Sequence, residues 1–162
     1  MHIVLLEPEI PHNTGAIGRT CSITGSTLHL IKPLGFSVGE KDLRRAGLDY
    51  WHELTVYYYE NYAHFKQQNP GAKIFMATTK ALNKYTDVHY DADSYILFGK
   101  ESAGIPEALL LENRESCIRI PMKPNARSLN LANAAAVVLY EALRQNDFPG
   151  LEGQGRLHRN HW

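Results

Sequence analysis

The chain has 162 residues, of which 44% are hydrophobic and 21% are charged, a composition typical of one folded domain and too hydrophobic for a disordered protein. Its 17 basic residues balance 17 acidic ones, so it lacks the overall positive field of many nucleic-acid binders, and any RNA contact must be local. It has neither a signal-like N-terminus nor an apolar run near the roughly 20 residues of a membrane span. We therefore expect a cytoplasmic protein that makes no membrane contact.

Short apolar or aromatic runs alternate with helical segments along the chain. The predicted strands are residues 3–6, 28–31, 54–59, 74–78, 95–98 and 118–120. Helices are predicted from Asn13 to about Ser22, over residues 60–68, after Pro106, and from about Leu129 to Gln145. Because most of the strands are continuously apolar, they are typical of a parallel sheet covered on both faces, and the fold class is α/β. Residues 1–150 are predicted to form a single domain, followed by a flexible C-terminal tail over residues 151–162.

The first polar loop follows the first predicted strand, over residues 7–19. Asn13 is interpreted as the N-cap of the following helix, which is a purely structural role. Arg19 lies six residues further along, among small and apolar residues. A buried or cleft-facing guanidinium needs an anionic partner, so Arg19 is a candidate phosphate ligand.

The second loop, over residues 97–106, leads from a strand through Gly99 and Gly104 towards a helix. Its glycine spacing matches neither of the common nucleotide-phosphate motifs, and Glu101 would repel a phosphate. Two glycines allow close approach of a neutral or cationic ligand, and a sulfonium suits a nearby carboxylate. The alternative is a glycine-rich turn with an exposed glutamate.

The third loop precedes the longest and most apolar helix. Ser128 is interpreted as the helix cap, which places Asn130 and Asn133 in the first turn. Buried amides require hydrogen-bond partners, so these two side chains predict a polar pocket that reads a small ligand.

Other kinds of site find little support in the sequence. Cys21 and Cys117 are far apart and are expected to be buried thiols. His158 and His161 have no further candidate ligand for zinc, so no metal is expected. The tyrosines at 57–59 are interpreted as core residues rather than as a stacking platform for bases.

Three segments carry a family resemblance: N-T-G-A-I-G-R, F-G-K-E-S-A-G-I-P, and I-R-I-P-M followed by S-L-N-L-A-N. In order and spacing they resemble the three motifs of the SPOUT methyltransferases, over residues 3–150. Within that superfamily the chain is most similar to the compact TrmL (YibK) type, which methylates the ribose 2′-OH of the wobble nucleotide of tRNA, cytidine or modified uridine at position 34. The resemblance implies a C-terminal trefoil knot, S-adenosylmethionine as cofactor, and a homodimer that pairs through its C-terminal helix.

The resemblance also implies roles for individual residues. Positions that match the family's cofactor pocket are Ala77, Thr78, Gly99, Glu101, Gly104, Ile120, Met122, Ser128, Leu129 and Asn133. Positions that match its catalytic or substrate-facing residues are Asn13, Arg19, Glu101, Ser128 and Asn130. The candidate contacts for the tRNA anticodon loop are Arg19, Lys41, Arg44, Arg45, Arg127 and Tyr140. One departure is Ala132, which stands where many relatives have Ser.

The role of Arg19 is interpreted as orienting an RNA phosphate and ribose, because a guanidinium is too basic to act as a general base. Two other functions compete with tRNA methylation. A non-catalytic RNA-binding module is disfavoured by the joint presence of Arg19, Glu101 and Asn130. Methylation of ribosomal RNA is disfavoured because the first motif begins near residue 7, without an extra RNA-binding domain before it.

Overall fold

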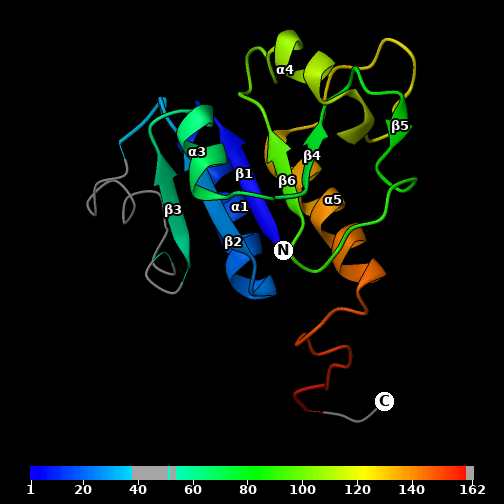
Figure 1. Ribbon diagram of the computed structural model, residues 1–162. Coiled ribbons are helices and arrows are strands. Elements are labelled where there is room, and N and C mark those ends of the chain that lie inside the picture. Colours follow the sequence, from blue (N-terminus) through cyan, green and yellow to red (C-terminus); the bar gives the residue numbers. More distant parts are fainter. Residues whose placement is uncertain (38–50, 52–53, 160–162) are drawn as a thin grey trace.

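A parallel β-sheet forms the centre of the computed structural model, which describes residues 1–37, 51 and 54–159 (Figure 1). The strands are β1 (His2–Leu6), β2 (Thr27–Ile31), β3 (Val56–Tyr59), β4 (Ile74–Ala77), β5 (Asn83–Lys84), β6 (Tyr95–Phe98) and β7 (Cys117–Arg119). Their order across the sheet is β3-β2-β1-β6-β4-β7-β5, and every described pairing is parallel. The predicted α/β class is confirmed.

Helices cover both faces of this sheet. They are α1 (Pro11–Thr24), α3 (Tyr62–Gln68), α4 (Glu107–Glu112) and α5 (Leu131–Gln145), with a 3-10 turn, η2, at Arg114–Ser116. Alternate residues of β1 point to opposite sides: Ile3 packs in the same apolar cluster as α1 and α5, whereas Val4 packs with α3 and α4. Burial on both faces explains why the strands are continuously apolar.

Two predicted helix caps are wrong. Helix α1 begins at Pro11, with Ile10 as an N-cap that has no side-chain bond, so Asn13 lies inside the helix. Proline has a fixed φ and no N–H to satisfy, which suits it to the first helical position. Helix α5 begins at Leu131 and is capped by Asn130 rather than Ser128.

The aromatic run at the sheet edge is only partly core. Tyr59 is buried, whereas Tyr57 and Tyr58 are 53% and 40% exposed. The predicted core role is therefore wrong for these two residues, because β3 is an edge strand and its described part pairs only with β2. Both cysteines are buried free thiols, as predicted.

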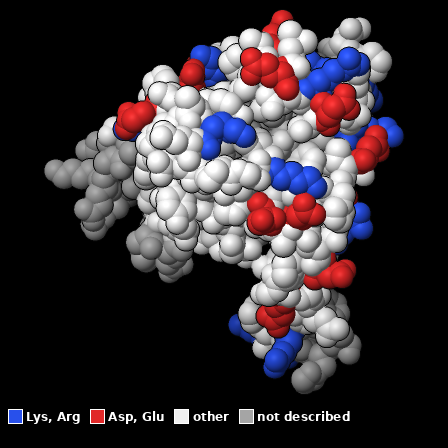
Figure 2. Space-filling model, viewed as in Figure 1, with Lys and Arg blue, Asp and Glu red and all other residues white. Residues whose placement is uncertain are grey.

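The surface carries acids and bases side by side. Figure 2 shows blue and red groups intermixed on the visible face, without one continuous positive area. Within the described part of the chain, no helix is long and apolar enough to cross a membrane. Residues 151–159 form neither helix nor strand, and Figure 1 shows this segment extending away from the domain beyond α5.

Candidate active site

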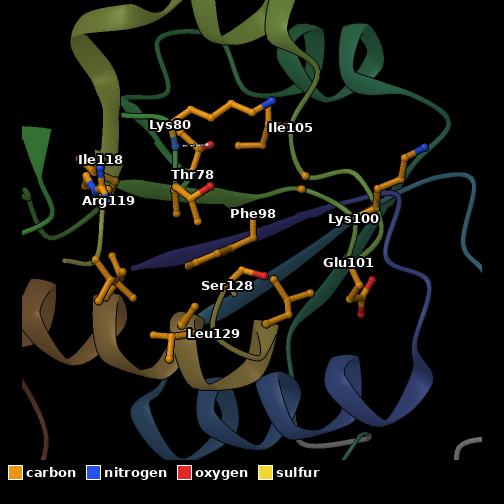
Figure 3. A pocket seen from close by; sticks show the side chains of 18 of the residues that line it. Thr78, Lys80, Phe98, Lys100, Glu101, Ile105, Ile118, Arg119, Ser128 and Leu129 are labelled. Atoms are coloured by element: carbon orange, nitrogen blue, oxygen red, sulfur yellow. Dashed lines mark hydrogen bonds between the residues drawn. The ribbon is translucent and has the colours of Figure 1, made fainter. Parts of the chain in front are cut away.

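A cavity of about 290 Å³ lies at the carboxyl ends of β4, β6 and β7, where the loops that carry the second and third motifs meet. All ten residues predicted for the cofactor pocket line it except Asn133, which is exposed on the first turn of α5. Figure 3 shows Thr78 and Lys80 on one side of the hollow, Ser128 and Leu129 on the other, and Phe98 between them. Carboxyl ends of parallel strands are where α/β folds commonly place ligands.

The floor of this cavity includes residues that the sequence prediction missed. Phe98, Ile105, Leu131, Ala134 and Val138 also line it. Each is an ordinary apolar residue of a strand, loop or helix, so the sequence carried no signal that separated them from the core. They add an apolar surface to a lining that also contains polar and charged side chains, a mixture in keeping with a small-molecule site.

Gly99 sits where the second loop folds back on its own backbone. A Cβ atom at Gly99 would lie 2.1 Å from the carbonyl carbon of Gly104 and 2.3 Å from the nitrogen of Ile105. Gly104 has a left-handed φ of +71°, and its N–H donates to the carbonyl of Lys100 over 2.8 Å. The structure thus requires glycine at 99 for close packing within the loop itself, a reason different from the ligand approach that the spacing suggested.

Two glutamates tie the first loop to the second by an exchange of carboxylates. The Glu101 carboxylate accepts the backbone N–H of Glu9 at 2.8 Å and of Ile10 at 3.3 Å, and the Asn13 side-chain amide at 2.9 Å. In return, the Glu9 carboxylate accepts both the backbone N–H and the hydroxyl of Ser102, each at 2.8 Å. We call this pair of interactions the carboxylate clamp. It fixes the loop that walls the cavity to the start of α1.

The carboxylates of the clamp are charged, and neighbouring carboxylates form ion pairs with lysines. The two hydrogen bonds from Ser102 hold the pKa of Glu9 below its usual value, so the carboxylate is charged at neutral pH. Lys100 pairs with Glu7 over 3.0 Å, and Lys80 pairs with Glu107 over 2.7 Å. Both lysines that line the cavity therefore already have acidic partners.

Asn13 links the clamp to the third loop. It is 5% exposed, and its amide donates to Glu101 while its oxygen accepts from the Asn130 amide over 2.9 Å. The Asn130 oxygen caps α5 by accepting from the backbone N–H groups of Ala132 and Asn133. The predicted buried amides at Asn130 and Asn133 are wrong, since both residues are exposed, and the buried amide is Asn13. Asn13 can donate to Glu101 and accept from Asn130 at the same time because a side-chain amide has both a donor and an acceptor group.

The sequence profile of the SpoU rRNA Methylase family matches residues 1–140. The chain belongs to this family.

Named relatives resemble almost the whole chain. The tRNA (cytidine(34)-2′-O)-methyltransferase of Escherichia coli (strain K12) is 47% identical over 152 residues, which cover 93% of this chain and 96% of that protein. A protein of the same name from Methylovorus glucosotrophus is 46% identical over 149 residues, 91% of this chain and 97% of its own.

Two solved structures share the fold of this chain. One, described as giving insight into 2-OH methylation of C/U34 on tRNA, matches with a TM-score of 0.84 and 41% identity over 90% of this chain and 95% of that one. An AdoMet-bound rRNA methyltransferase from Sinorhizobium meliloti matches with a TM-score of 0.76 and 26% identity over 88% of this chain and 55% of its own.

Those predicted RNA contacts of this SpoU-family chain that the structure describes lie outside the cavity. Arg19 is exposed on α1 and Arg127 is exposed in the third loop, and neither lines the cavity. Tyr140 is 42% exposed on α5. The remaining candidates, Lys41, Arg44 and Arg45, lie outside the described residues.

The donor set of the cavity suits an organic ligand. Among the described residues, no group of three or more His, Cys, Asp or Glu side chains is placed to hold a metal ion. The lining instead combines apolar side chains, a tight loop with backbone donors, one carboxylate, Glu101, and three basic side chains, Lys80, Lys100 and Arg119, of which the two lysines are paired with acids. Such a site can hold a flat apolar group and bind polar groups of an organic ligand around it.

Proposed function

We propose that this protein transfers a methyl group from S-adenosylmethionine to the ribose 2′-OH of the wobble nucleotide, position 34, of tRNA. The observation that carries the proposal is the cavity formed by the second and third motif loops and tied to the first by the carboxylate clamp. Relatives that match nearly the full length of the chain carry the name of this activity. The cytoplasm, where tRNA is modified, is the proposed location.

The volume and the lining of the cavity support S-adenosylmethionine as its ligand, with the volume near the lower limit for ligand pockets. Ligand pockets typically start at roughly 300 Å³, and this one measures about 290 Å³. Ile120 and Leu129 would hold the adenine between apolar walls, and the 99–104 loop would bind the rest through its backbone. When bound, the cofactor supplies the electrophilic methyl group on its sulfonium, so the chain has to align the partners and needs no metal.

The chain's own residues would provide alignment and charge. Glu101 lines the cavity, and its carboxylate, which accepts three hydrogen bonds from the first loop, would add negative charge near a cationic ligand without bonding it directly. Arg19, which is exposed on α1 and does not line the cavity, would bind a phosphate of the RNA strand and so help to orient the target ribose. The 2′-OH proton would then pass to water or to that phosphate, since a guanidinium does not accept protons at neutral pH.

The active form would be a homodimer that pairs through α5. Each chain would contain a trefoil knot in its C-terminal part. Supporting the dimer, α5 exposes Val137 and Tyr140 at 39% and 42%, and α1, which packs against α5, exposes Ile23 at 60%. Covering such side chains is a common reason for pairing. A neutral chain could also collect more phosphate contacts from two subunits. Sedimentation of an active monomer would contradict this assembly.

A pair of tRNA substrates tests the reaction. The purified protein should transfer tritiated methyl from S-adenosylmethionine to a tRNA with a cytidine at position 34, and EDTA should leave the rate unchanged if the RNA stays folded. The matched control is the same tRNA with a 2′-deoxyribose at position 34, which should accept no methyl. Equal labelling of both tRNAs, or labelling of ribosomal RNA instead, would contradict the proposal.

A further inference from the structure

A second cavity, of about 270 Å³, lies next to the first, between α4, the loop after β4 and the start of β7. Its inner wall is formed by Ala81, Leu110 and Cys117, which are 6%, 8% and 5% exposed. At its mouth stand Leu82 and Leu111, which are 75% and 78% exposed. Exposed leucines beside an apolar wall are typical of a surface that binds a ligand or another macromolecule.

The mouth of this second cavity also carries positive charge. Arg114, from η2, lines it and is exposed. Within the described residues its side chain has neither a hydrogen bond nor an ion pair, whereas the other two charged residues of the lining, Lys80 and Glu107, pair with each other over 2.7 Å and leave Arg114 as the net charge. The cavity is therefore complementary to a ligand that joins an apolar face to an anionic group.

The two cavities share a wall. Thr78 and Lys80 line both of them, so a ligand in the second cavity would lie directly beside a ligand in the first. An RNA strand whose ribose reaches the first cavity must continue past it in both directions. Each following nucleotide carries a base with apolar faces and a phosphate, which are the two features that the second cavity complements.

We propose that the second cavity binds the base of a loop nucleotide near the methylated one, with a phosphate of that strand on Arg114. This inference rests on the proposed function, because it takes the substrate to be single-stranded RNA. It assigns substrate contacts to Leu111 and Arg114, which lie in none of the three motifs. An apolar peptide of another protein is the competing ligand, but such a peptide would have no need of the unpaired arginine.

The test is a variant series combined with a scan of the RNA. Binding of a fluorescent anticodon stem-loop RNA is measured by anisotropy, with S-adenosylhomocysteine present, for wild type, Leu111→Ser and Arg114→Gln. Each variant should raise Kd about fivefold to tenfold, while affinity for S-adenosylhomocysteine stays unchanged. The matched controls are Leu157→Ser and Arg156→Gln, exposed residues of the segment after α5 that line neither cavity, and they should leave Kd unchanged.

Abasic RNAs then identify the bound base. One loop position at a time loses its base, and at one position the wild type and Leu111→Ser should bind with equal Kd, because that RNA lacks the base that Leu111 would touch. An equal penalty from Leu111→Ser at every position would overturn the inference, as would unchanged RNA binding by both variants, which is the outcome for a peptide site. Methylation of position 34 by the wild type is measured in parallel, so a failure of the proposed function is recognised separately.

Discussion

Replacing Glu101 by Gln keeps the shape of the side chain but removes an acceptor from the carboxylate clamp. In the better amide orientation, the remaining oxygen still accepts from Ile10 and Asn13. The new NH₂ group then faces the backbone N–H of Glu9, which now donates to the carboxylate over 2.8 Å. The NH₂ group and the Glu9 N–H are both donors, so the Glu9 N–H loses its acceptor. The opposite orientation would leave two donors without an acceptor.

The expected loss of stability follows from these contacts. A shielded donor left without an acceptor costs about 1–3 kcal/mol. The two surviving bonds also weaken when their acceptor loses its charge, because charged acceptors bind roughly twice as strongly. We therefore expect a loss of about 3 kcal/mol, which for a chain of 162 residues lowers the melting temperature by about 6–12 °C.

Differential scanning calorimetry measures this change, and Glu60→Gln is the matched control. Glu60 pairs with Lys32 over 2.7 Å, but its side chain is 69% exposed, so losing its charge should leave the melting temperature nearly unchanged. Methyl transfer is measured on the same preparations and should fall for Glu101→Gln because the cavity wall loosens. An inactive Glu101→Gln protein that melts at nearly the wild-type temperature would refute the reasoning and assign Glu101 directly to the chemistry.

Three further changes should give distinct results. Gly99→Ala should abolish binding of S-adenosylhomocysteine by calorimetry, because its Cβ would overlap the next turn of the loop, whereas Gly155→Ala, which meets no atom within 4 Å, should bind normally. Glu9→Ala should weaken that binding about tenfold by releasing Ser102, and Glu9→Gln, which can still accept, should restore most of it. Burial, followed by the nearby charge of His2, lowers the pKa of His29 to about 3, so the folded protein binds fewer protons than the unfolded chain. In urea unfolding, His29 should therefore contribute a loss of about 1.4 kcal/mol per pH unit from about pH 6.5 towards pH 3, so the slope of His29→Gln should be smaller than that of the wild type by this amount.

The longer strands could be predicted because a strand that is buried on both faces appears in the sequence as a continuous run of apolar residues. The ends of the helices were harder to predict, because neighbouring residues are often equally suitable as caps. Ser128 and Asn130 are both good cap residues, and the structure selects Asn130, whose side chain also bonds Asn13, 117 positions away. The short β5 was missed because two polar residues, Asn83 and Lys84, show no strand pattern and are placed only by pairing with β7.

The cavity could be predicted from three motifs, but the contacts that shape it could not. Glu9 and Glu101 are 92 positions apart, and they meet only because β1 and β6 are neighbours in the sheet. Nothing in the sequence signals that neighbourhood, since the two strands are separated by β2, β3, β4 and β5 along the chain. Asn13 was therefore assigned a local cap when its real partners are distant in sequence.

In the proposed reaction, the charges around the carboxylate clamp would influence where RNA phosphates bind. Glu7, Glu9 and Glu101 place three carboxylates around the 99–104 loop, and Lys100 lies among them as a cation already paired with Glu7. Phosphates are disfavoured beside such a rim, whereas a sulfonium is favoured. Cations that serve the RNA must then stand away from the cofactor loops, as Arg19 on α1 and Arg114 beside the second cavity do. Separating the two charge preferences would let a chain with no net charge bind a cationic cofactor and a polyanionic substrate at the adjoining sites that we propose.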